Sequence, residues 1–207
     1  MNYRYGFELE GFCTTSTGAV IIPPKNYPTD GFPGLVEVRT NGGDDIEKQY
    51  FKLLSGVSKY PDVHFDRHEH VFTPKEKVLL RARHSDKGEL SISNVYGKDP
   101  RHLGNRTLAS FQINISNLLR LKSEIVRDGK LVTEPAQYGL FDFVPIVKRL
   151  DEEFANEIRE ANRQPGFYAI KEEVRLEYRS LPNSVAKLNI YDAAALIKRI
   201  TKCVKGN

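Results

Sequence analysis

The sequence predicts an α+β domain, with a mainly antiparallel sheet and helices packed on one of its faces. Segments with strand-like alternation occur in pairs and runs instead of alternating regularly with helical segments, which favours antiparallel pairing. Each helical segment carries an apolar stripe, which indicates that it packs against the sheet. With 207 residues, 40% of them hydrophobic, the chain is expected to form a single domain, residues 1–207.

Strands are expected where apolar residues recur at every second position. These segments are Tyr3–Gly11, Leu35–Thr40, Val63–Phe65, Lys77–His84, Glu89–Val95, Thr107–Ser116 and Glu173–Ser180. Between the fourth and the fifth, Asp86-Lys87-Gly88 favours a hairpin turn. The proline-rich stretch Ile21–Pro33 is expected to be a surface loop, with a substrate lid as the alternative.

Helices are expected where apolar residues recur with a period near 3.6. The first follows Asp44 or Asp45, either of which can cap it, and its apolar face holds Ile46, Tyr50, Leu53, Leu54 and Val57. The others are Asn117–Arg127 (stopping at Gly129), about Phe143–Asn162, and about Ile190–Val204. Gly206 is a natural C-terminal cap for the last of them.

Composition and charge exclude several classes of protein. The net charge is +4, from 31 basic and 27 acidic residues, which is too balanced to indicate nucleic-acid binding by itself. Cys13 and Cys203 form no disulfide framework or metal-binding spacing and are expected to be small core residues. The chain has no apolar run long enough for a membrane span, and its first residues lack the apolar stretch of a signal peptide, so we expect a cytoplasmic protein without membrane partners.

Polar side chains share one face on four of the predicted strands, because residues two apart in a strand point to the same side. These polar positions are Glu8, Glu10, Glu37, Arg39, Gln112, Asn114, Arg175, Glu177 and Arg179. If the strands form one sheet, four carboxylates gather on one face and repel each other unless cations lie among them. Magnesium prefers oxygen ligands and usually bridges protein carboxylates to substrate phosphates, so this face can form a Mg–ATP site. The alternative is a solvated sheet face on which glutamates and arginines pair across strands.

Four segments, taken in order, resemble motifs of the glutamine-synthetase-like carboxylate–amine ligases. The segment 6–11 (Gly-Phe-Glu-Leu-Glu-Gly) is similar to their first-strand Glu-x-Glu motif, and Asp30-Gly31 followed by 37–40 (Glu-Val-Arg-Thr) resembles the second motif of the amidoligases. The segment 110–116 (Ser-Phe-Gln-Ile-Asn-Ile-Ser) stands where these families often have a His-x-His or His-x-Asn strand. The segment 175–183 is similar to the Glu-x-Arg-Ser-Leu segment of glutamate–cysteine ligases. The motifs span residues 6–183. The small size of the chain most resembles phage-encoded members of these families. If a phage encodes the chain, the expected location is the cytoplasm of its host.

The resemblance implies a glutamine-synthetase-like catalytic domain that joins a carboxylate to an amine, forming an amide or peptide bond. ATP phosphorylates the carboxylate, and the amine attacks the acyl phosphate and releases phosphate. The implied cofactors are ATP and Mg²⁺ or Mn²⁺, and the implied partners are small-molecule or peptide carboxylates and amines. A homo-oligomer is left open, since related enzymes often build their sites at subunit interfaces.

The same resemblance implies roles for particular residues. The metal ligands would be Glu8, Glu10, Glu37, Glu177 and Gln112. The catalytic residues would be Arg179, which meets the γ-phosphate or acyl phosphate, together with Glu177 and Arg175. Nucleotide or substrate would be bound by Gln112, Asn114, Arg39 and, through the predicted hairpin, Arg83. Two departures from the family are Gln112 in place of the usual histidine and Pro182 in place of an acidic residue.

Other features of the sequence leave alternatives open. His64, His68 and His70 lie among acidic residues and suggest a second metal site or an ordinary strand and loop. The middle of the chain is basic, which suits a nucleic-acid surface, phosphate binding or a solvated face equally. The basic residues there are Arg81, Arg83, His84, Lys87, Lys98, Arg101, His102 and Arg106. The second hypothesis for function is therefore an inactive protein of the ligase fold that binds nucleotide or nucleic acid. All four glutamates stand in phase, and this favours the ligase.

Overall fold

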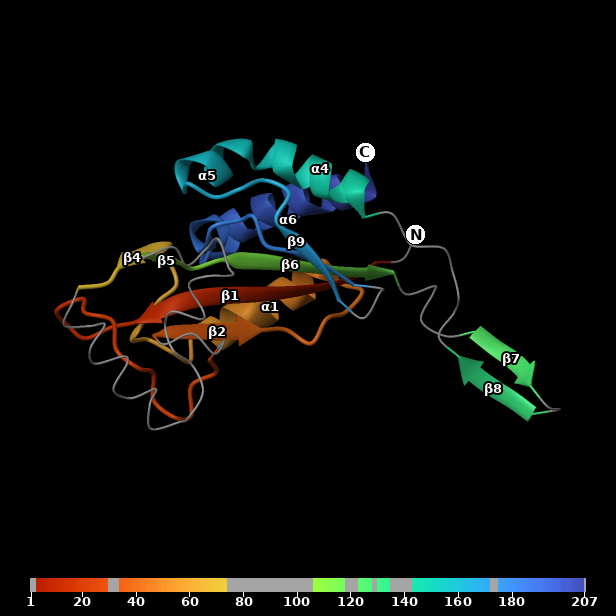
Figure 1. Ribbon diagram of the computed structural model, residues 1–207, viewed down its shortest axis with the longest axis horizontal. Helices are drawn as coiled ribbons and strands as arrows, with labels where there is room; N and C mark the ends of the chain where they lie inside the picture. The colour runs from red at the N-terminus through yellow and green to blue at the C-terminus, as the bar shows by residue number, and fades with distance from the viewer. Residues whose placement is uncertain are drawn as a thin grey trace.

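An antiparallel sheet built around one long strand organises the domain (Figure 1). The computed structural model describes residues 3–29, 34–73, 106–117, 123–127, 130–134, 143–171 and 175–206. Within these residues the sheet has six strands, of which β3 (Val63–His64) pairs with the end of β1. The other strands, in order across the sheet, are β2 (Leu35–Arg39), β1 (Tyr3–Cys13), β6 (Phe111–Asn117), β10 (Arg175–Tyr178) and β9 (Tyr168–Lys171).

The main helices pack on one face of this sheet. They are α1 (Ile46–Val57), α4 (Val144–Glu153), α5 (Ala155–Glu160) and α6 (Ile190–Lys205), and a short 3-10 helix, η2, covers Asn183–Val185. Two further strand pairs lie outside the main sheet: β4 (Glu69–Val71) with β5 (Arg106–Leu108), and β7 (Ser123–Arg127) with β8 (Lys130–Glu134). In the described part of the chain no helix is both long and apolar enough to cross a membrane.

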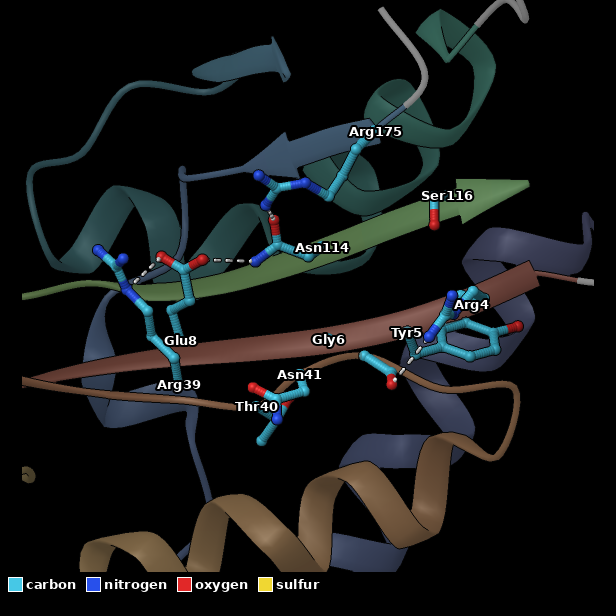
Figure 2. Close-up of a pocket in the computed structure, with 11 residues that line it drawn as sticks. Arg4, Tyr5, Gly6, Glu8, Arg39, Thr40, Asn41, Asn114, Ser116 and Arg175 are labelled. Atoms are coloured by element: carbon cyan, nitrogen blue, oxygen red, sulfur yellow. Dashed lines mark hydrogen bonds and ion pairs between the residues drawn. The ribbon is translucent and has the colours of Figure 1, made fainter. Parts of the chain in front are cut away.

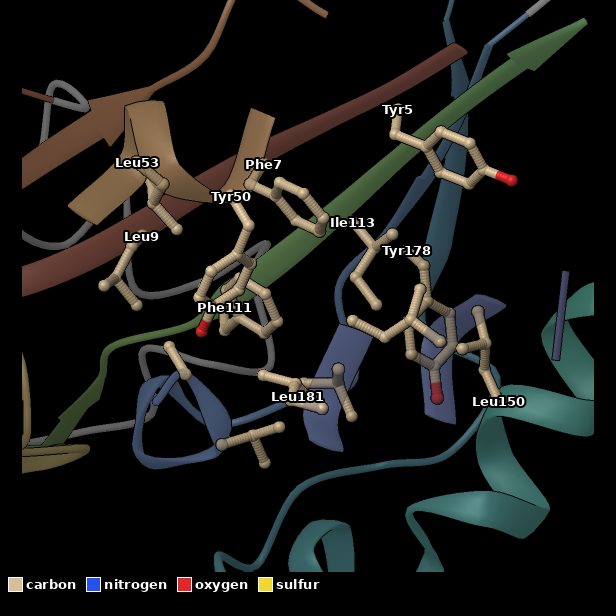
Figure 3. Packing of buried hydrophobic residues seen from close by; sticks show 14 of the residues in the cluster. Tyr5, Phe7, Leu9, Tyr50, Leu53, Phe111, Ile113, Leu150, Tyr178 and Leu181 are labelled. Carbon is tan, nitrogen blue, oxygen red and sulfur yellow. The ribbon is translucent and has the colours of Figure 1, made fainter. Parts of the chain in front are cut away.

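The hydrophobic core fills the space between the sheet and the helices (Figure 3). Phe7 of β1, Tyr50 of α1 and Phe111 of β6 form a cluster of three aromatic rings. The centroid of Phe7 lies 5.3 Å from that of Tyr50 and 5.7 Å from that of Phe111. The Tyr178 hydroxyl donates a hydrogen bond to Asp151 of α4 at 2.5 Å. Each fully buried aromatic or aliphatic side chain contributes about 1.5–3 kcal/mol to folding. The apolar face of the sheet is therefore held tightly, and the opposite face is available for polar side chains.

The structure confirms the coarse fold class and several of the predicted elements. The Asp45 side chain accepts a hydrogen bond from the Lys48 backbone N–H at 2.9 Å, so it is Asp45 that caps α1. Gly206 ends α6 with a positive φ of 77°, as expected of a glycine C-cap. Cys13 and Cys203 are both buried core residues, as predicted.

The helix predicted over Asn117–Arg127 is wrong. β6 continues to Asn117, and Ser123–Arg127 forms β7, which pairs with β8. The sequence contains the reason: Ile125 and Val126 favour strands, and Asp128-Gly129 is a dipeptide typical of two-residue hairpins. Arg127 pairs with Lys130, as expected of two strands joined by two residues.

Other boundaries also differ from the prediction. The helix predicted over Phe143–Asn162 is divided at the buried Phe154, and Thr107–Ser116 is shared between β5 and β6. Strand β9 was missed because its four residues show no clear alternation of polar and apolar positions. The strands predicted over Lys77–His84 and Glu89–Val95, and with them Arg83, lie outside the described residues.

Candidate functional site

The pairing register brings the polar positions of four strands onto one face of the sheet. Glu10 lies opposite Glu37, Glu8 lies opposite both Arg39 and Gln112, and Glu177 lies opposite Asn114. Directly opposed residues of antiparallel strands project to the same side. This confirms that the polar phases of β1, β2, β6 and β10 coincide, on the side away from the helices.

Most of these side chains are buried. Glu10, Glu37 and Glu177 are only 0%, 2% and 4% exposed, and Gln112 is 2% exposed. Glutamate is almost never fully buried unless it is paired, because burial of an unpaired charge is very costly. The alternative of a plain solvated face therefore does not fit the centre of this sheet, although it fits its rim, where the Arg39 side chain is 58% exposed.

Arginines lie between the glutamates on this face. Arg39 forms an ion pair with Glu37 and lies 3.7 Å from Glu8. Arg179 pairs with Glu177, whose other carboxylate oxygen lies 3.6 Å from Arg175. Every second residue of a strand shares a face, so the Glu-x-Arg and Arg-x-Glu spacings of β2 and β10 place a guanidinium beside each carboxylate.

The four glutamates consequently share the face without forming one cluster. Over the ranges that the structure describes, no group of three or more His, Cys, Asp or Glu side chains is suited to hold a metal ion. The expected convergence of Glu8, Glu10, Glu37 and Glu177 on one magnesium cluster is thus not seen as a single group. The geometry divides them into a buried pair, Glu10 with Glu37, and a second region around Glu8 and Glu177.

Buried oxygen atoms of Glu37 and Gln112 beside the buried pair are available for a cation. The Glu10 carboxylate accepts hydrogen bonds from the Ser110 backbone N–H at 2.7 Å and from Gln112 Nε2 at 3.1 Å. Two further oxygens, Glu37 Oε2 and Gln112 Oε1, are buried and have no hydrogen-bond partner among the described residues. Like charges directly opposite each other in a sheet are destabilising, and a buried acceptor without a donor is costly. A hard cation with oxygen ligands would relieve both, and Mg²⁺ is commonly bound through one or two carboxylates.

A pocket of about 410 Å³ opens at the other end of the face (Figure 2). Its walls come from the start of β1, the middle of β6, the first residue of β10 and the loop 40–42 that follows β2. The charged and amide side chains that line it are Arg4, Glu8, Arg39, Asn41, Asn114 and Arg175. Gly6 lies beneath it, and a Cβ added there would lie 3.4 Å from the Asn114 Cβ.

Hydrogen bonds run along one wall of this pocket. Arg175 Nη1 donates to Asn114 Oδ1 at 2.6 Å, and Asn114 Nδ2 donates to Glu8 Oε1 at 3.0 Å. On the opposite wall, Arg4 Nη2 donates to the Gly42 carbonyl at 3.4 Å. Asn114 is thereby fixed in one orientation, and it connects the Arg175 guanidinium to the Glu8 carboxylate.

Burial raises the pKa of Glu8 above its ordinary value, and the neighbouring charge of Glu177 raises it further. The Arg39 charge, the hydrogen bond from Asn114 and the Arg175 charge oppose this rise without cancelling it. A carboxyl whose pKa is raised in the folded state binds its proton more tightly there than in the unfolded chain. The Glu8 charge therefore lowers stability as the pH rises from the unfolded pKa through the folded pKa.

Glu8→Gln is accordingly expected to raise the melting temperature at pH 7.5 more than at pH 4. Glutamine mimics the protonated acid, so the variant differs least from the wild type where Glu8 is protonated in both states. The measurement is the difference in melting temperature between variant and wild type, followed by circular dichroism at both pH values. An equal difference at both, or a lower melting temperature for the variant at pH 7.5, would contradict the assignment.

Sequence reasoning missed several residues that shape the site. Arg163 is 9% exposed and donates to three backbone carbonyls: those of Ser180 (2.9 Å), Ala109 (3.3 Å) and Arg179 (2.6 Å). It thus ties the segment before β6 to the segment after β10. Asn183 Nδ2 donates to the Glu10 carbonyl at 3.0 Å. Both residues lie outside the expected strands, where no periodicity marks them.

His64, His68 and His70, for which the sequence left a metal site or an ordinary strand and loop open, form no metal-binding group in the described structure. The exposed His64 lies 3.8 Å from Asp66, whereas His70 is buried, with Nδ1 2.5 Å from an Arg67 nitrogen and its ring against Phe72. His70 of β4 thus makes a buried polar contact with Arg67.

Comparison of the chain with models of known protein families gives no match, and comparison with curated protein sequences gives none.

Proposed function

We propose that the chain is an ATP- and Mg²⁺-dependent ligase of glutamine-synthetase-like fold that joins a carboxylate to an amine through an acyl phosphate. The observation that supports the proposal is a pair of buried oxygens without a hydrogen-bond partner among the described residues, Glu37 Oε2 and Gln112 Oε1. They lie beside the buried Glu10 carboxylate, on the same sheet face as an arginine-lined pocket. Such a face combines anionic ligands for a cation with cationic ligands for phosphate and carboxylate groups. Apolar residues in place of buried charges often leave a fold equally stable or more stable, so the burial of these charges favours a function beyond stability.

The residues present fit a magnesium ion. Glu10, Glu37 and Gln112 would hold it. On the same face, Glu8 lies opposite Gln112, and Glu177 lies opposite Asn114. Bound there, the ion would neutralise phosphate charge and bridge the phosphates to the protein. Gln112 suits this role through its unpartnered Oε1, since its Nε2 already donates to Glu10.

Arg175 of β10 and Arg179, which directly follows β10, would serve the transferring group. In the reaction, a substrate carboxylate oxygen attacks the γ-phosphorus of ATP and ADP leaves; the amine then attacks the acyl carbon and phosphate leaves. Arg179 and Arg175 flank Glu177, and both side chains are partly exposed, at 22% and 30%. A guanidinium offers paired donors that match phosphate oxygens, so these two residues would stabilise the charge that develops on the phosphoryl group.

The test is a screen for ADP release with pairs of substrates. Purified protein, ATP and Mg²⁺ are incubated with a matrix of amino acids and short peptides as carboxyl donors and amine donors. The proposal expects ADP release that needs one donor of each kind, and a product whose mass equals the two substrates less one water. ATP binding without turnover across the whole matrix would favour the inactive, nucleotide-binding alternative.

A further inference from the structure

Strand β9 lies at one edge of the main sheet, and among the described residues it pairs with β10 alone. We propose that an extended acidic peptide adds to β9 as a further antiparallel strand. Its apolar side chains lie on the helical side of the sheet, and an acidic side chain lies on the polar face. The inference deepens the ligase proposal, because it names the class of carboxyl donor and the way that donor docks.

The backbone groups of Tyr168 and Ile170 point to the outer edge of β9. The Arg179 N–H donates to the Phe167 carbonyl at 2.9 Å, and these two residues continue the β9–β10 register by one step. In an antiparallel pair, residues that bond to the partner strand alternate with residues that do not. Ala169 therefore bonds to β10, whereas Tyr168 and Ile170 direct their N–H and C=O groups outward. Such a row of groups is the template on which another strand can pair.

The side chains of the same two residues form the apolar part of the docking surface. Tyr168 lies opposite Tyr178, and Ile170 lies opposite Leu176, on the helical side of the sheet. Tyr178 and Leu176 are fully buried, but Tyr168 and Ile170 are 38% and 42% exposed. The apolar layer of the sheet thus continues to its edge and ends in two exposed side chains. These fit the alternate apolar residues of an added strand.

The polar face at this edge suits an acidic side chain. Ala169 lies opposite Glu177 on that face. The described charged residues of β9, of β10 and directly after β10 are three cations and one anion: Lys171, Arg175, Arg179 and Glu177. The alanine side chain is short, so a glutamate of the added strand can extend over it toward the guanidinium groups beside Glu177. Its carboxylate would be attracted by the excess of positive charge.

The same charges disfavour a second copy of the chain as the added strand. Directly opposed residues of antiparallel strands share a face, so pairing of Tyr168 with Ile170 of a copy would bring the two polar faces together. Lys171 and Arg175 of both copies would then lie on one continuous face, where like charges repel. An acidic segment reduces the excess of positive charge at this edge, whereas a copy doubles it.

The acidic side chain has a role in the proposed reaction, and this step rests on the ligase proposal. One oxygen of its carboxylate would attack the γ-phosphorus of ATP beside Arg179, and ADP would leave. The amine would then attack the acyl carbon with loss of one proton to solvent, and phosphate would leave. The product is an amide on a side chain of the peptide.

Docking is tested by fluorescence anisotropy in EDTA, without nucleotide, so the result does not depend on the ligase proposal. The probe is fluorescein-labelled Thr-Val-Glu-Val-Thr-amide, whose valines would lie opposite Tyr168 and Ile170. Glutamine in place of its glutamate should weaken binding about tenfold or more, since a charged partner is lost. N-methylation of both valines should abolish binding, because their N–H groups would donate to β9. N-methylation of the glutamate, whose N–H would point away from β9, should leave binding unchanged.

Ile170→Pro and Ile170→Thr form a matched pair of variants. Proline removes an N–H that β10 does not use, and edge strands tolerate proline at such positions, so the variant should fold and lose peptide binding. Threonine keeps the N–H and favours a strand, so binding should remain within about tenfold of the wild type. The N-methylated peptides keep the test valid if the proline variant folds poorly.

Four outcomes decide the matter. Unchanged binding of the peptide with N-methylated valines, or unchanged binding to a folded Ile170→Pro, would overturn the proposal. A wild-type dimer that Ile170→Pro converts to a monomer, without peptide binding, would assign the edge to a second copy and overturn it as well. Turnover of free amino acids without peptide binding would overturn the docking alone. Peptide binding with the expected losses, but without ATP turnover, would support the docking and refute only the ligase.

Discussion

Arg179→Lys is expected to lower substrate-dependent phosphate release by roughly 100-fold or more, on the scale of losing one group that stabilises a transition state. Arg179 pairs with Glu177, and its own carbonyl is held by Arg163, so its backbone is fixed close to the proposed reacting centre. Lysine keeps the charge but replaces a planar fork of donors with a single point charge. The variant should fold with near-normal thermal stability and bind Mg–ATP within about tenfold of the wild type, a difference of about 1.4 kcal/mol.

The matched control is Arg199→Lys on α6. Arg199 pairs with Glu153 and Glu157 at 2.8 Å. Arg199→Lys therefore also removes a guanidinium that is paired with carboxylates, but on the helical side of the protein. We expect this change to affect the melting temperature and not turnover per folded molecule. Full turnover in Arg179→Lys, with the same substrates that the wild type uses, would mean that Arg179 supports only the sheet.

Glu10→Gln is expected to abolish the stabilisation of the protein by divalent metal. A ligand that binds only the folded state stabilises it by an amount that grows with the logarithm of the ligand concentration above Kd, so Mg²⁺ or Mn²⁺ should raise the melting temperature of the wild type. Removal of one of two paired carboxylates should eliminate most of this shift, because the cation loses charge and an oxygen ligand. In metal-free buffer the variant loses the repulsion between Glu10 and Glu37 and also one of the two oxygens that accept from Ser110 and Gln112, so the metal-dependent shift, and not the metal-free melting temperature, is the diagnostic quantity.

The measurement is a thermal unfolding series with increasing metal concentration, repeated on the exposed Glu47→Gln as a control. A metal-dependent shift of the same size in Glu10→Gln and in the wild type would exclude Glu10 as a ligand.

The alternation of polar and apolar residues was sufficient to predict the polar face. Side chains in a strand alternate between two faces of the sheet. Because the apolar residues of these strands are buried against the helices, the residues between them project from the opposite face. These are Glu8, Glu37, Gln112 and Glu177. The first and last helices were predictable because both caps, Asp45 and Gly206, are local signals.

What the sequence could not predict depends on pairing in three dimensions. That Arg4 and Arg175 line the same pocket follows from the pairing of β1 and β10 with β6, which no local pattern specifies. The division of the glutamates into a buried pair and a second region depends on where the arginine side chains lie. The β7–β8 hairpin was mistaken for a helix because short apolar runs are ambiguous in period, although Asp128-Gly129 was a turn signal.

ATP binding by the wild-type protein, measured by titration calorimetry with Mg²⁺ and again with EDTA, tests the central proposal most directly. If the buried Glu10–Glu37 pair and Gln112 hold a cation that bridges to the phosphates, ATP should bind with Mg²⁺ or Mn²⁺ present. Binding should be lost when EDTA removes the metal, because no cation would then bridge the phosphates to the Glu10 and Glu37 carboxylates, which repel them. ATP binding of equal affinity with and without EDTA would contradict the metal-dependent site, and with it the proposed ligase.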